Sequence, residues 1–442
     1  MAPTETIETV ATIQLLQEKI RAKTARVGII GLGYVGLPLA VEFAKAGFTV
    51  TGIDISAEKA RRVNAGDSYI GDIPSSTLGP LVESGKLRAT ADFSAVLELD
   101  TINICVPTPL RKTKDPDMSF IVASCQEIAR HFHAGMLVIL ESTTYPGTTD
   151  EVVLPMLTKG GLEAGRDFFL CFSPERVDPG NPKYQTSNIP KVVGGCTPAC
   201  TDMGRLFYEQ ALEHVVAVSS TQVAEMVKLL ENTFRMINIG LVNEIAMMCD
   251  RMGINVWEVI DAAATKPFGF MPFYPGPGLG GHCIPIDPFY LSWKTRQAGI
   301  EARFIELAGY INGQMPHFVV DKVQNALNDA GKAVKGSRIH VMGVAYKRDI
   351  EDVRESPALD IMMLLQRRGG VISYSDPHVP VLHLEGMDLS ATPQESAAAA
   401  DCVVIVTDHS AFDYAALVDR ATLIVDSRNA LKNFRSDKIV RL

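Results

Sequence analysis

Residues 26–36 read Arg26-Val27-Gly28-Ile29-Ile30-Gly31-Leu32-Gly33-Tyr34-Val35-Gly36, an apolar run that passes into three spaced glycines. The run predicts a buried β-strand, and the residues that follow it predict a helix. Gly31 would permit the tight turn, Gly33 would let a pyrophosphate approach the backbone, and Gly36 would let the helix pack on the strand. This order of strand, glycine turn and helix predicts a dinucleotide-binding domain.

An acidic residue indicates which dinucleotide is bound. Asp54 ends the next predicted strand, eighteen residues after Gly36. Its carboxylate can accept hydrogen bonds from the hydroxyls of the adenosine ribose, and it would repel a 2′-phosphate. The sequence therefore predicts NAD, rather than NADP, as the cofactor.

Predicted strands and helices alternate on both sides of a helical middle. Between about residues 213 and 315 strand signals are absent, and residues 221–250 predict one long helix because they hold no proline and a single glycine. The predicted fold is α/β, with two Rossmann-like doubly wound parallel-sheet domains joined by a central helical region with a long helix. The predicted strands are residues 26–31, 48–54, 101–106, 137–141, 168–173, 191–194, 338–344, 371–375, 402–407 and 423–426.

The 442 residues exceed what one hydrophobic core usually supports. We expect three domains, at residues 1–212, 213–315 and 316–442. In the last of these, Ser356 followed by Pro357 predicts the start of a helix, because a serine caps the first turn and proline suits the first helical position.

Composition excludes several classes of protein. With 42 Lys and Arg against 51 Asp and Glu, the net charge of −9 does not suit a surface for nucleic acid or anionic membrane. No apolar run approaches the roughly 20 residues that span a bilayer, and the start of the sequence lacks the features of a signal peptide, so we expect a cytoplasmic protein. The eight cysteines are scattered and include no Cys-x-x-Cys pair. We expect reduced thiols and no metal site.

One cysteine stands in a setting that suits chemistry. The stretch Gly280-Gly281-His282-Cys283-Ile284-Pro285-Ile286-Asp287 places it on a glycine hinge, with a carboxylate four positions on. Beside a nicotinamide site, a thiol can capture an aldehyde as a thiohemiacetal and present it for a second oxidation. The combination predicts oxidation of an alcohol to a carboxylate.

On the predicted long helix, Lys228 and Asn232 are four residues apart and share a face. An ammonium and an amide there could stabilise an alkoxide or a tetrahedral oxyanion. The same pair suits a two-electron hydroxyacid dehydrogenase, so it does not decide the reaction.

The second α/β half has one glycine, Gly343, after its first strand. It therefore lacks the phosphate-binding loop of a dinucleotide domain. Lys347, Arg354 and Arg428 follow predicted strand ends, where open α/β sheets bind ligands, and such cations suit a diphosphate.

Together these motifs resemble, nearly end to end, the UDP-glucose/GDP-mannose dehydrogenase family. The resemblance implies oxidation of a nucleotide sugar at C6 with two NAD, an N-terminal NAD domain, a central helical dimerisation region and a C-terminal domain that binds UDP. It also implies a homodimer or a higher homo-oligomer. The motifs are Gly31-x-Gly33-x-x-Gly36, Val106-Pro107-Thr108-Pro109, Glu141-Ser142-Thr143, Ser173-Pro174-Glu175-Arg176, Lys228 with Asn232, Gly280-Gly281-His282-Cys283 with Asp287, and Lys347 with Arg354-Glu355-Ser356-Pro357.

The resemblance implies a role for each matching residue. Cys283 would be the nucleophile, Glu175 a general acid and base, and Thr143 would position water. Lys228 and Asn232 would hold the oxygen, and Asp287 would act with the lysine on a water. Implied cofactor contacts are Gly31, Gly33, Tyr34, Val35, Gly36, Asp54, Lys59, Pro107, Thr108, Thr143 and Arg354, and implied substrate contacts are Glu175, Arg176, Lys228, Asn232, Tyr274, Gly276, Gly278, Gly280, Lys347 and Arg428.

The loop of residues 266–279 bears on the sugar. It is similar to the branch that acts on UDP-N-acetylglucosamine, which implies UDP-N-acetylglucosaminuronic acid as the product and a place in polysaccharide biosynthesis. Many relatives carry an arginine where this chain has Lys266-Pro267-Phe268. The alternatives left open are UDP-N-acetylgalactosamine, UDP-N-acetylmannosamine or UDP-glucose as substrate, a two-electron hydroxyacid dehydrogenase, and a non-catalytic nucleotide-sugar sensor.

Overall fold

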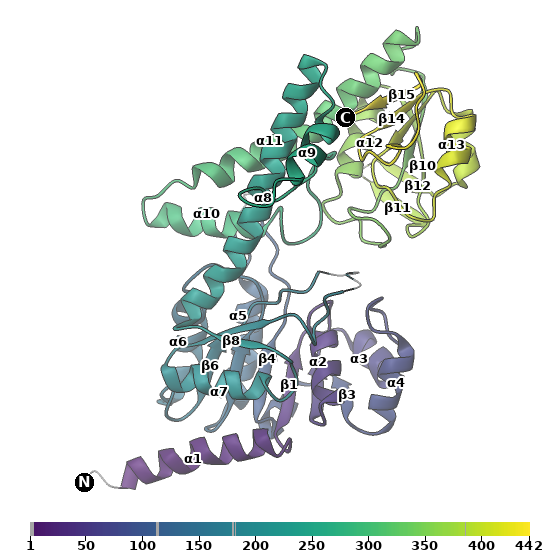
Figure 1. Ribbon diagram of the computed structural model, residues 1–442. Helices are drawn as coiled ribbons and strands as arrows, with labels where there is room; N and C mark the ends of the chain where they lie inside the picture. The colour runs from purple at the N-terminus through teal and green to yellow at the C-terminus, as the bar shows by residue number, and fades with distance from the viewer. Residues whose placement is uncertain (1–3, 112–114, 179–180, 182, 385) are drawn as a thin grey trace. The chain divides into compact units, whose positions relative to one another are not determined.

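The computed structural model describes residues 4–111, 115–178, 181, 183–384 and 386–442. The chain forms two compact units, Met1–Glu231 and Asn232–Leu442 (Figure 1). The boundary between them falls within the long helix α8 (Thr221–Met252). The presence of α8 confirms the helix predicted at residues 221–250. Among the described residues, no helix has both the length and the apolar character needed to cross a membrane.

The first unit contains one large sheet. Its strands are β1 (Arg26–Ile30), β2 (Thr49–Ile53), β3 (Leu87–Thr90), β4 (Thr101–Ile104), β5 (Leu137–Leu140), β6 (Phe169–Phe172), β7 (Lys191–Gly195) and β8 (Val215–Ala217). They lie in the order β3-β2-β1-β4-β5-β6-β7-β8 and are parallel, except that β6 and β7 run antiparallel. The predicted parallel sheet is confirmed.

The strands β3 and β8 are missing from the prediction. The expectation that strand signals are absent from about residue 213 is wrong for β8, which pairs with β7. The predicted strands of similar length, such as β4 and β5, are buried along their whole length, whereas β3 and β8 are partly exposed and lack such an apolar run. The first sheet therefore extends beyond residue 212.

Helices cover both faces of this sheet, as Figure 1 shows. The alternation of side chains in β5 explains why, because Leu137 and Ile139 pack in one core and Val138 and Leu140 in another. A strand that is apolar on both sides must be covered on both. The helices are α1 (Thr4–Arg21), α2 (Gly36–Lys45), α3 (Ala57–Asn64), α4 (Ser75–Glu83), α5 (Ser119–His131), α6 (Leu154–Leu157) and α7 (Pro198–Tyr208), with short turns at Phe93–Glu98, Thr149–Val153 and Thr158–Gly160.

The second unit begins with helices and ends with a smaller sheet. After α8 come α9 (Val256–Ala264), α10 (Asp287–Gln297) and α11 (Arg303–Asp329). The strands β9 (Arg338–Met342), β10 (Val371–Ser375), β13 (Cys402–Ile405), β14 (Ile424–Asp426) and β15 (Ile439–Arg441) form a parallel sheet in the order β10-β9-β13-β14-β15. The remaining elements are α12 (Pro357–Arg367), the hairpin β11 (Val381–Leu384) and β12 (Met387–Ser390), the turn Gln394–Ala399, and α13 (Tyr414–Arg420).

The predicted start of α12 is confirmed. The side chain of Ser356 accepts a hydrogen bond from the Ala358 amide, and Pro357 occupies the first helical position. The predicted strands of this half are also present, whereas β11, β12 and β15 are not predicted. These three are short and polar or lie at the end of the chain, where periodicity is weak.

Candidate functional site

The glycine loop after β1 has the geometry that a dinucleotide requires. Gly31 has a φ of 90°, which favours glycine. A Cβ on Gly36, the first residue of α2, would come within 1.8 Å of the carbonyl oxygen of Gly31. At Gly33 a Cβ would meet nothing within 4 Å, so the loop leaves open space where a pyrophosphate would approach the backbone. These residues fit NAD.

Asp54 lies directly after β2 and supports this loop. Its Oδ2 accepts hydrogen bonds from the Leu32 amide at 2.8 Å and from the Lys59 ammonium at 3.3 Å, and its Oδ1 accepts one from the Ser56 amide at 2.9 Å. The carboxylate therefore holds the glycine loop, and its contact with a ribose stays a prediction.

We expect Asp54→Asn to weaken NAD binding and to reduce the preference for NAD over NADP by about tenfold or more, because an amide neither repels a 2′-phosphate nor accepts as many hydrogen bonds. Titration of the protein with NAD and with NADP measures both dissociation constants. Asp67→Asn is a matched control, because Asp67 is an exposed carboxylate paired with Arg62 outside the glycine loop. An unchanged ratio of the two constants in Asp54→Asn would refute this assignment.

The other residues predicted to contact the cofactor divide between the two units. Pro107 and Thr108 follow β4, and Thr143 follows β5, so they stand at the same sheet edge as the loop after β1. Tyr34 is exposed, and Val35 is the N-cap residue that precedes α2. Arg354 belongs to the second unit, where its Nη2 lies 2.5 Å from Oδ2 of Asp352.

Charged side chains gather inside the first unit at this edge of the sheet. The ammonium of Lys191 donates to Oε2 of Glu141 at 2.5 Å and to Oε2 of Glu175 at 3.2 Å. The ammonium of Lys228 donates to the carbonyl oxygen of Glu175 at 2.5 Å. All four residues are buried, so two cations and two carboxylates balance one another away from water.

The surroundings shift the pKa values of the two acids in opposite directions. Burial raises the pKa of Glu141, although Lys191 opposes this. Burial acts in the same sense on Glu175, but Lys191, the Val177 amide and Lys228 outweigh it and hold the pKa of Glu175 below its usual value. Glu175 is therefore ionised at neutral pH and can accept a proton.

The segment that carries Thr143 is tied to the start of α8. Both carboxylate oxygens of Glu225 accept hydrogen bonds, from the amides of Gly147 at 2.5 Å and Thr149 at 2.9 Å. Burial raises the pKa of Glu225 to about 7, against these hydrogen bonds, which favour the ionised form. No sequence motif indicated this contact.

In the second unit, the cysteine loop and α8 meet. The amide of Asn232 donates to Oδ2 of Asp287 at 2.6 Å, and the backbone amide of Asp287 donates to the carbonyl oxygen of Cys283 at 2.8 Å. Asn232 and Asp287 are buried, whereas Cys283 is exposed. The structure thus brings together three of the six predicted catalytic residues in this unit, and Lys228, Glu175 and Thr143 lie in the other.

Glycines of the preceding loop pack against the C-terminal sheet. A Cβ on Gly276 would come within 2.9 Å of Nη1 of Arg428, and one on Gly280 within 2.6 Å of Cβ of Tyr346. Gly278 has a φ of 141° and packs against Pro357. Of the predicted substrate residues, Gly276 therefore lies beside Arg428, whereas Gly278 and Gly280 both lie beside Pro357. Lys347 follows Tyr346 in the chain.

Two predicted substrate residues are engaged elsewhere. The Tyr274 ring stacks on Trp257, and its hydroxyl donates to Asp261 at 3.0 Å, both on α9. Arg176 forms an ion pair with Glu231 at 2.6 Å. A role for either in binding substrate requires that it change these contacts.

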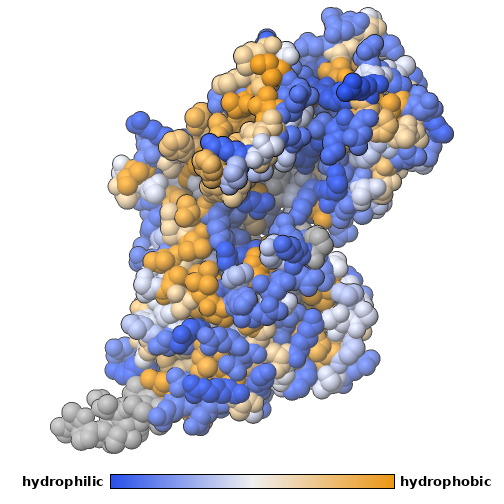
Figure 2. Space-filling model, in the orientation of Figure 1, coloured by the Kyte–Doolittle hydropathy of each residue, from blue (hydrophilic) through white to orange (hydrophobic). Residues whose placement is uncertain are grey.

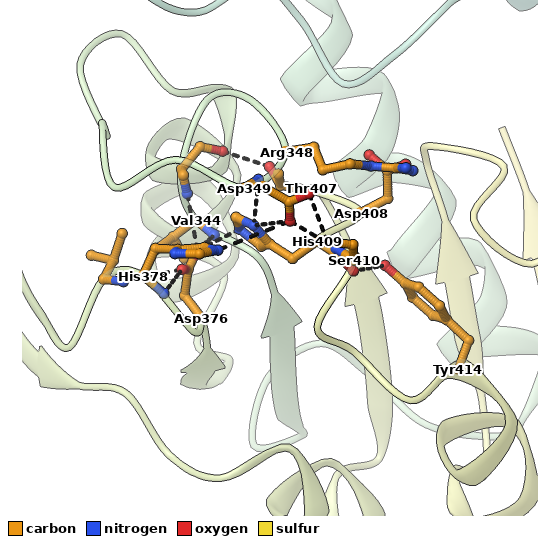
Figure 3. Close-up of polar contacts among 12 residues, drawn as sticks. Val344, Arg348, Asp349, Asp376, His378, Thr407, Asp408, His409, Ser410 and Tyr414 are labelled. Atoms are coloured by element: carbon orange, nitrogen blue, oxygen red, sulfur yellow. Dashed lines mark hydrogen bonds and ion pairs between the residues drawn. The ribbon is translucent and has the colours of Figure 1, made fainter. Parts of the chain in front are cut away.

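Asp376, after β10, repeats in the second unit the role of Asp54. Its Oδ2 accepts hydrogen bonds from the amides of Val344 at 2.7 Å and Ala345 at 3.2 Å, in the loop that leads to Lys347 (Figure 3). Nε2 of His409 lies 3.0 Å from the same oxygen. This network fixes the backbone at the carboxyl end of β9.

The same network contains a group that could hold a metal ion. Among the described residues, Asp349, His378 and His409 place one possible ligand atom each within 4.8 Å of one another. Nδ1 of His409, however, accepts a hydrogen bond from the Asp349 amide at 3.0 Å, so its lone pair is engaged and its Nε2 must donate to Asp376. The arrangement serves to hold the loop.

Comparisons with known proteins agree with this geometry. The UDP-glucose/GDP-mannose dehydrogenase family matches with its NAD binding domain at residues 25–212, its central domain at 222–314 and its UDP binding domain at 340–433. The chain is 36% identical over 403 residues to a UDP-N-acetyl-D-mannosamine dehydrogenase of Salmonella typhi, which covers 87% of this chain and 94% of that protein.

Two further relatives carry different substrate names. The chain is 35% identical over 395 residues to a UDP-N-acetyl-D-glucosamine 6-dehydrogenase of Pseudomonas aeruginosa, covering 88% of this chain and 92% of that protein. The solved structure of a UDP-D-ManNAc dehydrogenase from Pyrococcus horikoshii superposes with a TM-score of 0.87 at 32% identity, covering 94% of this chain and 98% of that one.

Proposed function

Because the chain belongs to the UDP-glucose/GDP-mannose dehydrogenase family and is an NAD-dependent UDP-sugar dehydrogenase, we propose that it oxidises the C6 hydroxyl of UDP-N-acetylglucosamine to a carboxylate through Cys283. The observation that carries the proposal is that Cys283 is exposed and tied to two other candidate residues. Its carbonyl oxygen accepts a hydrogen bond from the Asp287 amide, and the Asp287 carboxylate accepts one from the Asn232 side chain. A thiol in this position serves covalent chemistry better than it serves packing.

The proposed reaction passes through two adducts of Cys283. NAD, held by the glycine loop after β1, would supply the hydride acceptor for both oxidations at C6, alcohol to aldehyde and thiohemiacetal to thioester, one molecule for each. The hydroxyl proton of the first oxidation would pass to solvent. Between the two oxidations, the Cys283 thiolate forms a bond to the aldehyde carbon. The aldehyde oxygen becomes negative, and Lys228 and Asn232 stabilise it. Water then attacks the thioester carbon, its proton passes to Glu175, and the C–S bond breaks to return the thiolate and release the acid.

The measurement that tests this reaction is the yield of NADH per sugar. We expect about two NADH for each UDP-N-acetylglucosamine consumed, because the alcohol loses four electrons. A two-electron hydroxyacid dehydrogenase would give about one with its own substrate, and a non-catalytic sensor none. A yield of one, with aldehyde as the product, would contradict the proposed thioester.

The same assay identifies the sugar. The proline-rich and aromatic loop of residues 266–279 supports a 2-acetamido substrate, because its apolar rings suit an acetyl group and its stiff backbone loses little entropy on binding. UDP-N-acetylmannosamine is the nearest alternative, since relatives with that name are equally similar. We expect the highest kcat/KM with UDP-N-acetylglucosamine when it is compared with UDP-N-acetylmannosamine, UDP-N-acetylgalactosamine and UDP-glucose.

We also propose that the helices of the second unit form a homodimer interface, in keeping with a dimerisation region at residues 213–315 between an NAD domain at 1–212 and a UDP domain at 316–442. On α8, Phe234, Leu241 and Met248 repeat every seven residues and are 45%, 53% and 47% exposed. On α11, Phe304 and Leu307 are 75% and 54% exposed. Apolar surface gathers over these helices in Figure 2, as an interface requires.

Light scattering tests this interface. We expect a dimer or larger species for the native chain and a monomer for the double variant Leu241→Glu with Leu307→Glu, because burying two carboxylates in an apolar interface is unfavourable. Leu97→Glu is the control, since Leu97 is 60% exposed but lies in the first unit. A double variant that keeps the native mass would contradict the assigned interface.

A further inference from the structure

The first unit buries an ion network that the proposed reaction does not use in full. Lys191 is 2% exposed and Glu141 is 1% exposed, in a protein interior where unpaired charges are rarely tolerated. The Glu141 carboxylate also accepts hydrogen bonds from the Tyr208 hydroxyl and from the Asn103 amide, the latter at 2.8 Å. Every charge in the network is therefore paired through short contacts.

The sheet topology explains how these groups meet. Glu141 follows β5, and Glu175 lies three residues after β6, so both stand at the carboxyl ends of adjacent parallel strands. β7 runs antiparallel to β6, so its first residue, Lys191, lies at the same edge. The reversal of one strand thus inserts a lysine between two carboxylates.

We propose that Lys191 is a positioning residue that holds the Glu175 carboxylate ionised and in one orientation, with Glu141 as the counter-anion that keeps Lys191 in place. This inference rests on the proposed function, in which Glu175 takes a proton from the attacking water. Both oxygens of the Glu175 carboxylate are held. Oε1 accepts hydrogen bonds from the backbone amides of Arg176 at 2.7 Å and Val177 at 2.8 Å, and Oε2 accepts one from the Lys191 ammonium. Neither oxygen can rotate away without losing a hydrogen bond.

The titratable groups around Glu175 come from several elements. They are Lys191 on β7, Lys228 on α8, Glu141 after β5, Cys105 after β4 and Tyr208 on α7. Burial raises the pKa values of Cys105 and Tyr208 well above their usual values, so both stay neutral near pH 7. The charge on Glu175 is therefore governed by the two lysines and by Glu141.

The role predicts shifts of opposite sign for two substitutions. Lys191→Met removes a cation beside Glu175, so the acid limb of the kcat–pH profile should move to higher pH by about one unit or more. Glu141→Gln removes an anion, so the limb should move to lower pH. Lys191→Arg keeps the charge and should restore most of the native profile.

A purely structural lysine would give a different result. In that case Lys191→Met would lower kcat by the same factor at every pH, and this outcome would overturn the proposal. Each single variant leaves one member of the Lys191–Glu141 pair buried without its partner, which could unfold the protein. The double variant Glu141→Gln with Lys191→Met removes both charges and so avoids this cost. Its acid limb should lie at higher pH than that of Glu141→Gln alone, and coincidence of the two limbs would also overturn the proposal.

Failure of the proposed function would be visible separately, as native protein that yields no NADH with any of the UDP-sugars. In that case, the melting temperature measured as a function of pH tests the role of Lys191. A raised pKa of Glu175 in the folded Lys191→Met protein means that the folded state binds its proton more tightly, so stability is lost as pH rises. The deficit of Lys191→Met relative to the native chain should grow from pH 5 to pH 8, and a deficit independent of pH would refute the role.

Discussion

Cys283→Ser should bind the UDP-sugar normally but form acid at least about a thousandfold more slowly, because a serine hydroxyl is a poorer nucleophile and cannot form a thioester. The yield should fall from about two NADH per sugar to one or fewer. Acid production followed by chromatography and substrate affinity measured by calorimetry separate loss of chemistry from loss of binding. Serine differs from cysteine by one atom, so this substitution tests the sulfur itself.

Cys196→Ser is the matched control for the sulfur. The Cys196 thiol is partly buried and donates to Oδ1 of Asp150 at 3.1 Å, a hydrogen bond that a hydroxyl can also make. This variant should retain near-native kcat and a yield of two NADH. Native rates of acid formation by Cys283→Ser would remove the covalent step from the mechanism, whatever the behaviour of the control.

Lys228→Met should lower kcat by about 10²–10³ with a smaller change in KM, because the ammonium is assigned to the oxygen that becomes negative during the reaction and not to a contact made equally in the ground state. Methionine keeps an apolar stem of similar length at this buried position. The loss should persist at pH values where Glu175 is ionised, which distinguishes it from the shifted acid limb expected for Lys191→Met. A smaller shift of the same limb to higher pH is also expected, because Lys228 too lowers the pKa of Glu175.

Lys322→Met is the control for this lysine. The Lys322 ammonium donates to Oδ1 of Asp250 at 2.5 Å and to the carbonyl oxygen of Arg441 at 2.8 Å, so it is hydrogen-bonded about as closely as Lys228. It lies on α11, which carries none of the candidate catalytic residues. We expect a small fall in melting temperature and near-native kcat. Equal effects of the two substitutions on kcat would mean that Lys228 acts only on folding.

Local signals were sufficient for much of the fold. The glycine loop after β1, the start of α12 at Ser356 and nearly all of α8 are recognisable because turn geometry, capping and the absence of helix-breaking residues are properties of neighbours in the chain. Strands β3, β8 and β15 were not predicted because they are partly exposed and lack the fully apolar run that marks β4, β5 and β6. The family resemblance was confirmed, whereas the roles of individual residues remain predictions.

The candidate site shows the same division. Cys283, Asn232 and Asp287 could be selected from the sequence because their chemistry and spacing are unusual. In the structure Asn232 is hydrogen-bonded to the Asp287 carboxylate, and the Asp287 amide to the backbone of Cys283. Lys191 was not predicted to belong to the site, because a lysine at the start of an apolar strand is usually solvated. A charged residue adjoining a fully apolar strand is the signal that could have indicated it.

The sequence by itself determined the order of most strands, the long helix, the nucleotide-binding loop and the chemistry available to the reaction, because these follow from side-chain type and from short-range patterns. Only the tertiary structure decided that β7 runs antiparallel to β6, and hence that Lys191 lies between Glu141 and Glu175. Strand direction within a sheet depends on contacts between residues far apart in the chain. The charge state of a buried acid depends on those same contacts, and no local pattern records them.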